Sequence, residues 1–157
     1  MADKISPERR SRNMAAIRSQ GNVTTELRMV KILREYQISG WRRHARIPGR
    51  PDFSFPLRRI AVFVDGCYWH GCPRCYKAPK GNPEYWKRKI ERNRRRDRIV
   101  RSELRLAGWR VLRFWEHALH AEDSVARRIK KACLMRLASA DRADANPKTH
   151  DVADRHK

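Results

Sequence analysis

The apolar run I-A-V-F-V at Ile60–Val64 constrains the fold of this chain more than any other segment. It does not alternate with polar residues, as a strand with one solvent-exposed face would. A short apolar run of this kind is typical of a central strand that is covered on both faces. We therefore expect an α/β fold in which both faces of the sheet that contains this strand are covered.

The same run lies inside a stretch, residues 52–75, that carries several kinds of functional side chain. Two acids stand beside the strand, three cysteines follow at C-x4-C-x2-C spacing, and two aromatic residues and a histidine lie between the cysteines. Carboxylates suit a hard cation, thiolates suit a softer one, and aromatic rings stack on bases. This combination indicates chemistry on nucleic acid.

Composition supports a polyanionic partner. The 157 residues include 38 Lys and Arg against 17 Asp and Glu, which gives a formal net charge of +21. The length is that of one domain, and so large a charge is best accommodated by a nucleic acid. No apolar run is long enough to span a membrane, and the N-terminus lacks the apolar region of a signal peptide. We expect a cytoplasmic protein without a membrane partner.

Turn residues and hydrophobic periodicity predict the order of the elements. Helices are expected at residues 6–19, 24–37, 82–107 and 123–137, and strands at 41–47, 52–55, 59–65 and 109–115. A loop over 66–83 holds the cysteines. We expect a single domain over residues 1–137 and a disordered polar tail over 138–157.

The long helix over 82–107 is rich in Lys and Arg and has an unusual apolar stripe. The stripe contains Trp86, Ile90, Val100 and Leu104, with the polar residues Asn93 and Asp97 among them. Polar residues on such a stripe either form hydrogen bonds in the core or face a ligand. Helical spacing alone does not choose between these two interpretations.

Three acids are candidate ligands for Mg²⁺, which usually takes only one or two protein carboxylates. Asp52 and Asp65 stand at the ends of neighbouring strands, and antiparallel pairing of those strands would bring them together. Glu26 falls on the buried side of the second helix and could supply a third acid. A single strand-end acid in an Arg-rich chain more often forms a salt bridge, but convergence with a histidine favours a metal site.

The thiolates of Cys67, Cys72 and Cys75 can surround one tetrahedral Zn²⁺. The fourth ligand stays open at this point, the candidates being His70, His117, His120 and Cys133. Four protein ligands would make the site structural rather than catalytic. Cys133 lies in the last predicted helix and is better explained as a core residue.

His70 is a candidate general base or acid for attack of water on phosphate. Three aromatic residues lie in or near the cysteine loop, namely Tyr68, Trp69 and Trp86. Such rings stack on bases or wedge between base steps, whereas the strand residues Trp109 and Trp115 are expected to pack in the core.

Four motifs occur in order, namely R-S-x-N-M-x-x-I, P-G-R-P-D-F, V-D-G-C-Y-W-H-G-C and G-W-R-V-L-x-x-W-E. Together they resemble the very short patch repair (Vsr) DNA mismatch endonucleases over about residues 6–135. The resemblance implies a restriction-endonuclease-like fold of the PD-(D/E)XK type, in which a mixed central sheet is flanked by helices. It also implies a structural Zn²⁺ and a catalytic Mg²⁺. It implies an enzyme that nicks one strand of double-stranded DNA on the 5′ side of the mispaired T in a T·G mismatch.

Such mismatches arise when 5-methylcytosine deaminates, so the resemblance implies a functional link to a cytosine-5 DNA methyltransferase. It also implies mismatch-repair proteins as partners and a place in the bacterial nucleoid. Residues 1–20 would form an arm that contacts DNA.

The resemblance further implies individual roles. Asp52 corresponds to the catalytic metal-binding aspartate, His70 to the proposed general base, and Glu26 to the helix acid near the active site. The zinc ligands would be Cys67, Cys72, Cys75 and His117. The DNA contacts would come from Tyr68, Trp69 and Trp86 beside the mismatch, from Met14 and Ile17 in the other groove, and from Lys89 and Asn93 on the mismatched pair.

The chain departs from the family pattern at Val64-Asp65, where the best-known member has Thr-His. The backbone carbonyl of Val64 can still bind a metal, whereas Asp65 is either a metal ligand or an acid that orients water. The lysine of the wider nuclease superfamily is absent from this strand. Two alternatives remain, a related nuclease with a different DNA target and a zinc-stabilised DNA-binding module without catalysis.

Overall fold

The computed structural model of the chain describes Ser6, Arg9 and residues 21–144, with side chains as far as Met135. In chain order the elements are η1 (a π-helical turn, Val23–Leu27), α2 (Arg28–Glu35), β1 (Arg42–Arg43), β2 (Phe53–Phe55), η2 (a 3-10 turn, Pro56–Arg58), β3 (Ile60–Asp65), α3 (Pro83–Leu106), β4 (Arg110–Trp115), η3 (a 3-10 turn, Glu116–His120) and α4 (Glu122–Asp144). No helix within these described residues has the length and apolar character of a membrane span.

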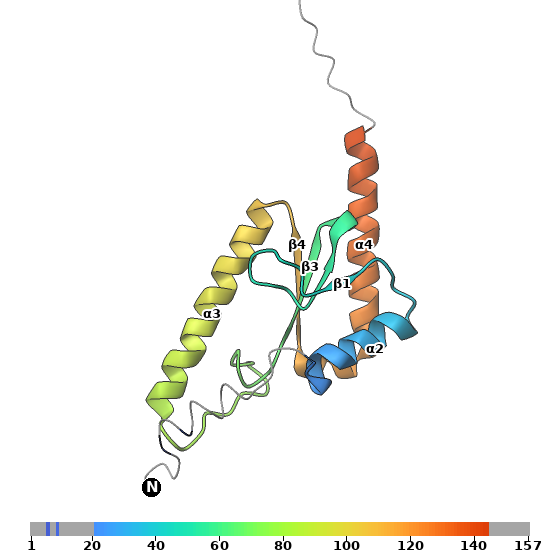
Figure 1. Cartoon of the computed structure of the whole chain (residues 1–157). Helices are drawn as coiled ribbons and strands as arrows, with labels where there is room; N and C mark the ends of the chain where they lie inside the picture. Colours follow the sequence, from blue (N-terminus) through green and yellow to red (C-terminus); the bar gives the residue numbers. More distant parts are fainter. Residues whose placement is uncertain (1–5, 7–8, 10–20, 145–157) are drawn as a thin grey trace, which may run out of the picture.

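The four strands form one mixed sheet in the order β1-β2-β3-β4 (Figure 1). β2 pairs antiparallel with both β1 and β3, whereas β4 pairs parallel with β3, with Asp65 opposite Trp115. A parallel pair needs a long crossover connection, which α3 supplies. Because β3 and β4 run in the same direction, the loops that follow Asp65 and Trp115 leave the sheet at the same end.

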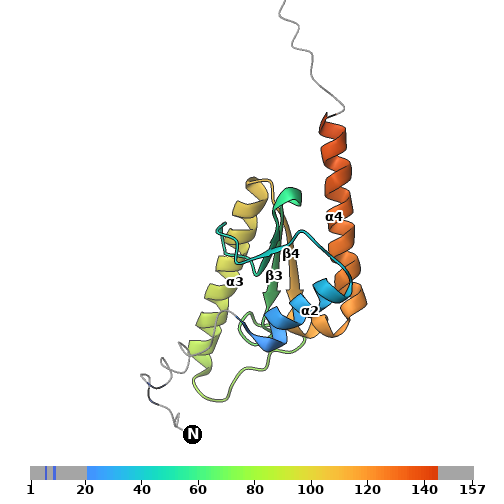
Figure 2. The same cartoon turned by 45° about the vertical axis from the view of Figure 1, so that its right-hand side comes forward.

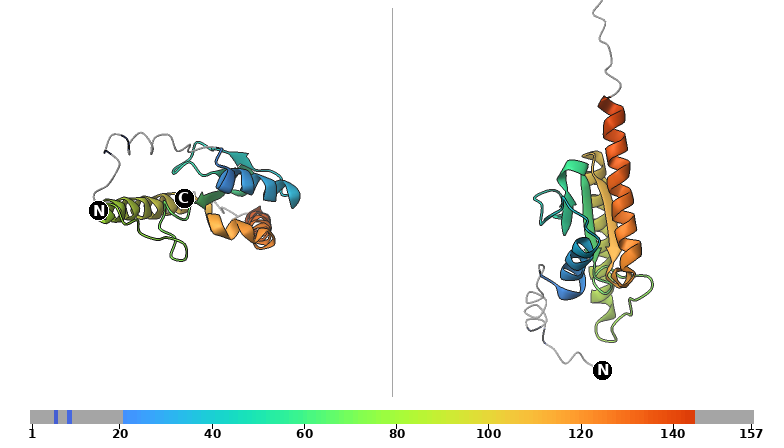
Figure 3. Two further views of the ribbon diagram at one scale, coloured as in Figure 1. Left: turned by 90° about the horizontal axis from the view of Figure 1, so that it is seen from below. Right: turned by 90° about the vertical axis from the view of Figure 1, so that its right-hand side faces the viewer.

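Helices cover both faces of the sheet, with α3 on one side and α2 and α4 on the other (Figure 2, Figure 3). The residues of β3 alternate between these two layers. Ile60, Val62 and Val64 belong to the main core with α2 and α4, whereas Ala61 and Phe63 pack with Leu104 of α3. All six residues of β3 are buried, which confirms the central strand expected from its unbroken apolar run.

α3 follows its sequence signals closely. It begins with Pro83 at the first helical position and ends at Leu106, with Gly108 at a φ of 78° just beyond it. Pro at the start and Gly after the end are the usual boundary residues. Trp86, Ile90 and Leu104 are buried, so most of the apolar stripe faces the protein.

The strand predicted for residues 41–47 was too long, because only Arg42–Arg43 pair with β2. The strand stops at His44, whose backbone adopts a φ of 51°. This left-handed conformation leaves the extended geometry that a strand needs. The imidazole of His44 instead reaches Glu26, with its Nε2 2.9 Å from Oε1.

The last helix was expected to end at residue 137, but α4 continues to Asp144. The segment A-S-A-D-R-A-D is rich in alanine, which favours helix continuation. Residues 145–157 lie outside the described residues. So does nearly all of the predicted helix 6–19, although the N–H of Arg9 donates to Oγ of Ser6 at 3.2 Å, as a serine N-cap would arrange.

Candidate active site and metal centre

Asp52 lies directly before β2, and its carboxylate reaches across to β3. Its Oδ2 accepts a hydrogen bond of 2.7 Å from the backbone N–H of Val64. Burial raises the pKa of Asp52; the bond from Val64 opposes this rise, and the nearby carboxylates of Glu26 and Asp65 add to it. Within the part of the chain that the structure describes, no basic side chain forms an ion pair with Asp52.

Gly49 fixes the turn that precedes Asp52. Its φ is 74°, and a Cβ at this position would lie only 2.2 Å from Cγ1 of Val100 on α3. The turn therefore packs backbone-first against α3, which only glycine allows at that φ and that distance. The position of Asp52 depends on this contact as well as on the pairing of β2 with β3.

His70 and Asp97 form a hydrogen-bonded pair between the cysteine loop and α3. Nδ1 of His70 lies 2.6 Å from Oδ2 of Asp97. Burial disfavours ionisation of Asp97, but His70 and the guanidinium of Arg113 outweigh it and hold the pKa of Asp97 below its usual value. When the carboxylate of Asp97 accepts a hydrogen bond from Nδ1–H, Nε2 of the ring remains free to take up a proton.

Asp65 and Arg113 form a second pair beside the first. Nε of Arg113 donates to Oδ2 of Asp65 at 2.7 Å, and Nη2 donates to Oδ1. Nη2 of Arg113 also lies 3.2 Å from Oδ2 of Asp97, so one guanidinium bridges both carboxylates. The fork geometry of arginine suits such a carboxylate pair.

These groups line one open pocket of about 560 Å³ at the end of β3. Its wall includes Asp52, Val64, Asp65, His70 and Asp97. The first three come from the ends of β2 and β3, His70 from the cysteine loop and Asp97 from α3. Of the acids expected to converge with His70, Asp52 and Asp65 line this pocket, whereas Glu26 does not.

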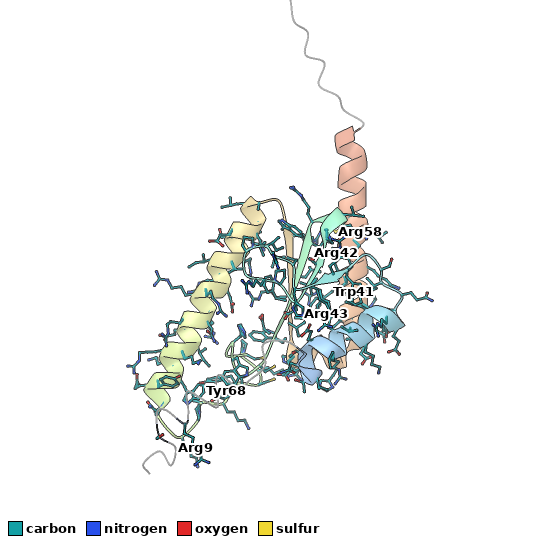
Figure 4. The ribbon with its side chains drawn as sticks, in the orientation of Figure 1. Arg9, Trp41, Arg42, Arg43, Arg58 and Tyr68 are labelled. Carbon is teal, nitrogen blue, oxygen red and sulfur yellow. The ribbon has the colours of Figure 1, made fainter. Side chains whose placement is uncertain are left out.

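Glu26 lies close to this pocket but is neutralised by other partners. Its carboxylate is 2% exposed and accepts hydrogen bonds from the N–H of Gly21 at 2.5 Å and Nε of Arg43 at 2.6 Å. His44 lies at the same oxygen as Arg43. In Figure 4, Arg43 lies at the end of β1 nearest to α2. Glu26 is the buried helix acid expected from the sequence, and its charge acts on Asp52 at a distance.

Cys67, Cys72, Cys75 and His117 form a compact cluster whose ligand atoms all lie within 4.8 Å of one another. Nδ1 of His117 lies 3.2, 3.6 and 3.3 Å from the three sulfurs. Tetrahedral Zn²⁺ with ordinary bond lengths implies an S···N separation of about 3.6 Å. The donor set and spacing therefore fit zinc.

The other candidates for the fourth zinc position lie elsewhere. His70 is paired with Asp97, and Cys133 is buried in the main core, as expected. Burial and the neighbouring thiols raise the pKa of Cys67 to about 11. A cation at the centre of the cluster would relieve this crowding, because thiolates are its ligands.

The aromatic residues of the loop pack on one another near the N-terminal end of α3, where Figure 4 labels Tyr68. The ring of Tyr68 lies 5.1 Å from that of Trp69 and 5.2 Å from that of Trp86, between centroids. Trp86 is 8% exposed, whereas Tyr68 and Trp69 are half-buried. Nδ2 of Asn93 donates to the carbonyl oxygen of Trp69 at 2.8 Å and so holds this loop on α3.

Comparison with known proteins places these residues in a family. Residues 2–77 match the family profile described as DNA mismatch endonuclease Vsr. DNA mismatch endonuclease Vsr of Escherichia coli (strain K12) is 38% identical, with 80% of this chain and 80% of that protein aligned. The chain belongs to the DNA mismatch endonuclease Vsr family. This confirms the resemblance that its four motifs gave.

Other relatives of this Vsr-family chain carry a different description. Type II nicking enzyme V.NmeDIP of Neisseria meningitidis serogroup C is 43% identical over 73% of this chain and 78% of that protein. Type II nicking enzyme V.XorIIP of Xanthomonas oryzae pv. oryzae is 38% identical over 83% of this chain and 96% of that protein.

Among solved structures, the chain resembles the Homing Endonuclease I-Bth0305I Catalytic Domain with 25% sequence identity and a TM-score of 0.48. The match covers 71% of this chain and 94% of that chain. A score of this size marks only partial overlap, so no function follows from it.

The site of this Vsr-family chain includes two groups that the sequence did not assign to it. The sequence marked Asp97 as unusual, because it is an acid on the apolar stripe of a helix. Helical spacing could not predict that its partner is His70. Arg113 had no signal of its own, and only the parallel register of β3 and β4 brings it to Asp65. Met14 and Ile17 lie outside the described residues. Lys89 lies on α3 with its Nζ 5.9 Å from the ring centroid of Tyr85.

Proposed function

We propose that the protein is a DNA endonuclease that nicks one strand on the 5′ side of the mispaired T in a T·G mismatch. The observation that carries the proposal is the pocket where Asp52 meets the His70–Asp97 pair, in a chain of the Vsr family. The pocket combines a carboxylate that suits a cation with a histidine that can move a proton. Metal-assisted hydrolysis of a phosphodiester bond can use both groups.

His70 is the general base in this proposal. Its Nε2 takes a proton from the attacking water while Nδ1 stays bonded to Asp97. The carboxylate of Asp97 stabilises the imidazolium that forms, and Arg113 keeps Asp97 ionised and in place. Glu26, which is paired with Arg43, raises the pKa of Asp52 through its negative charge and takes no part in proton transfer.

Asp52 is the proposed magnesium ligand, and its surroundings fit that role. It is a half-buried carboxylate without an ion-pair partner among the described residues, and burial together with the nearby acids raises its pKa. The N–H and C=O of one strand residue point to the same edge, so the carbonyl of Val64 lies on the side of Asp52. Mg²⁺, when bound, stabilises the charge that develops on the phosphate.

Asp65 stays a prediction as a second magnesium ligand. Both of its carboxylate oxygens accept hydrogen bonds from Arg113. To bind a cation, Asp65 would have to share an oxygen that Arg113 already holds. The alternative role, in which Asp65 orients a water molecule, requires less rearrangement of the Asp65–Arg113 pair.

Zinc has a structural role in this proposal. Cys67, Cys72 and Cys75 belong to the loop after β3, whereas His117 belongs to η3 after β4. A cation shared by the four residues ties these two segments together. The same loop carries His70, Tyr68 and Trp69, so the zinc site also fixes the position of these three residues.

Selectivity for a mismatch would come from the aromatic loop. Mispaired steps cost less to unstack than paired ones, so rings that wedge into the stack favour them. Tyr68 and Trp69 are the half-buried rings that DNA can reach, with Trp86 packed behind Tyr68. The remaining proposed contacts are those of Met14, Ile17, Lys89 and Asn93.

The rest of the proposal follows from charge and family. The net charge of +21 suits the phosphates of double-stranded DNA. The mixed sheet flanked by helices is compatible with a restriction-endonuclease-like fold. A cytosine-5 DNA methyltransferase and mismatch-repair proteins are the proposed functional partners, because T·G mismatches arise from deaminated 5-methylcytosine.

A second candidate is a nicking enzyme with a different recognition sequence. The relatives named Type II nicking enzymes favour it. The pocket and its chemistry would be unchanged, and only the bases around the nick would differ. A panel of T·G duplexes with varied flanking bases separates the two candidates.

The proposal is tested with Asp52→Ala and His70→Ala on a labelled T·G duplex with Mg²⁺. Both variants should lose nicking, His70→Ala by about 10²–10⁴-fold, because proton transfer contributes that much. Binding should persist in both, since neither residue supplies positive charge to a phosphate. Nicking by either variant at the wild-type rate would contradict the assigned roles.

A further inference from the structure

A second pocket, of about 470 Å³, lies beside β4 on the other side of the catalytic groups. The pocket of about 560 Å³ described above is called the Asp52 pocket. The two pockets share four side chains, which form the wall between them: Asp65, His70, Asp97 and Arg113. The helix α3 crosses above this wall. Its residues Arg96 and Val100 line the Asp52 pocket, whereas its residues Arg98 and Arg101 line the second pocket, which we call the β4 pocket.

Four arginines line the β4 pocket, and two of them are already engaged. Arg94 donates from Nε to the carbonyl oxygen of His70 at 3.3 Å and from Nη2 to that of Gly71. Arg113 is held by Asp65 and Asp97. Asp65 and Asp97 are the two acids that line the pocket, and both of their carboxylates are paired with Arg113.

Arg98 and Arg101 are different. Both are exposed, and neither forms a hydrogen bond or ion pair with any residue that the structure describes. They stand three residues apart on one helix, so their guanidinium groups project from the same side. Two uncompensated guanidiniums in a concave site favour an anion, and phosphate oxygens match their fork geometry.

We propose that the β4 pocket binds the backbone phosphate next to the scissile one on the nicked strand, with Arg98 and Arg101 as its donors. This rests on the proposed function, because it takes the scissile phosphate to lie between Asp52 and His70. A DNA strand whose scissile phosphate lies between Asp52 and His70 can continue past His70 into the β4 pocket. Holding both phosphates would fix the direction in which the strand crosses the catalytic histidine.

The tight packing of the loop supports a preformed site. Gly71 has a φ of 64°, and a Cβ on it would lie 2.6 Å from Ile90 and 2.9 Å from Nη2 of Arg94. The loop that forms one side of the pocket is therefore clamped against α3. A preformed pocket binds an anion without first ordering its own backbone.

The test is binding of T·G duplexes by fluorescence anisotropy without Mg²⁺, so that no nick forms. Each duplex carries one neutral methylphosphonate linkage, placed in turn at every position of the T strand around the proposed nick. The wild-type protein should lose about tenfold in affinity at a linkage next to the scissile one. The variant Arg98→Ala/Arg101→Ala should bind natural DNA more weakly and show no further loss at that linkage.

The variant Arg95→Ala is the matched control, because it removes one arginine from α3 outside the β4 pocket. It should keep the wild-type sensitivity to the adjacent linkage. The double variant should also lower the slope of log K against log salt by about 1, the contribution of one phosphate. Thermal melting checks that the exposed substitutions leave the fold intact.

Two results would overturn the proposal. One is a double variant that remains as sensitive as the wild type to the adjacent methylphosphonate. The other is a wild-type protein that is insensitive to every linkage next to the scissile one. Failure of the proposed function is distinguishable, because it appears as absent nicking with Mg²⁺ while the methylphosphonate map still reports the pocket.

Discussion

Asp52 differs from the other three acids of the site because it has no cationic partner among the described residues. Glu26 is paired with Arg43, and Asp65 and Asp97 share Arg113. Asp52 instead accepts a hydrogen bond from the N–H of Val64. A carboxylate left in this state is poised for a cation. It also weakens the fold, because its folded-state pKa is raised above the ordinary value of 3.8.

The first prediction concerns the stability of Asp52→Asn. A raised folded-state pKa means that the proton binds more tightly to the folded protein, so the ionised form costs stability at neutral pH. Asn keeps an oxygen for the Val64 N–H but carries no charge. At pH 7 and without Mg²⁺, Asp52→Asn should melt at a higher temperature than the wild type and should not nick DNA.

The advantage should disappear below about pH 3.8, where Asp52 is protonated in both folded and unfolded states. Thermal melting across pH 3 to 8, in metal-free buffer, measures it. A variant that melts lower than the wild type at pH 7 would show that the charge of Asp52 stabilises the fold.

The second prediction separates the charge-pairing role of Asp65 from metal binding. Asp65 is 7% exposed, so Arg113→Leu leaves a buried carboxylate without its main partner and should cost about 3–5 kcal/mol. The double variant Asp65→Leu/Arg113→Leu should recover much of this loss, because no unpaired charge remains at position 65. Urea unfolding of the wild type, both single variants and the double variant gives the coupling energy.

A coupling energy near zero would mean that the two side chains act independently. In that case Asp65 would be free for a metal, and its variants should change the Mg²⁺ dependence of nicking instead of stability.

At the scale of elements, the loop after β3 and the turn η3 after β4 depend on each other. The parallel register ends both strands at the same edge, where Cys67, Cys72 and Cys75 meet His117. The loop contacts α3 through Gly71 and through the aromatic residues that pack on Trp86. Metal binding is expected to add to this order by joining the loop to η3.

The third prediction is that the purified protein contains about one zinc ion per chain and that Cys75→Ala loses it. Cys75 is the exposed ligand, so its removal disturbs little packing besides the metal site. The matched control is Cys133→Ala, a cysteine outside the cluster, which should keep the zinc. Elemental analysis measures the metal, and tryptophan fluorescence follows the loop.

Loss of zinc should raise the solvent exposure of Trp69 and lower the melting temperature. A wild-type protein that folds and melts identically with and without zinc would contradict the bracing role.

The sequence could predict those elements whose local signals agree with their surroundings. The unbroken run Ile60–Val64 predicted β3, and Pro83 and Gly108 predicted the ends of α3. It could not predict the short β1, because no local signal marks the left-handed backbone of His44 or its contact with the distant Glu26. The pairs His70–Asp97 and Asp65–Arg113 were missed for the same reason, since each joins elements whose relative position only the folded chain sets.

At the scale of the whole molecule, the sheet places the chemistry at one end. β3 and β4 run in the same direction, and α3 lies along one side of the sheet (Figure 1). The cysteine cluster follows the ends of both strands, and Asp97 of α3 lies 2.6 Å from His70 of the cysteine loop, between Oδ2 and Nδ1. The aromatic loop, the two pockets and the basic helix α3 therefore lie together. A duplex bound to this end would meet Tyr68 and Trp69, the proposed catalytic pair His70–Asp97 and the positive charge of α3 together.

The most direct test of this account is nicking of matched duplexes that differ only in one base pair, T·G against T·A, with Mg²⁺ and each strand labelled separately. A single nick is expected in the T strand of the T·G duplex, on the 5′ side of the mispaired T. The T·A duplex should stay intact under the same conditions. Equal nicking of both duplexes, or nicking of neither across a panel of flanking sequences, would contradict it.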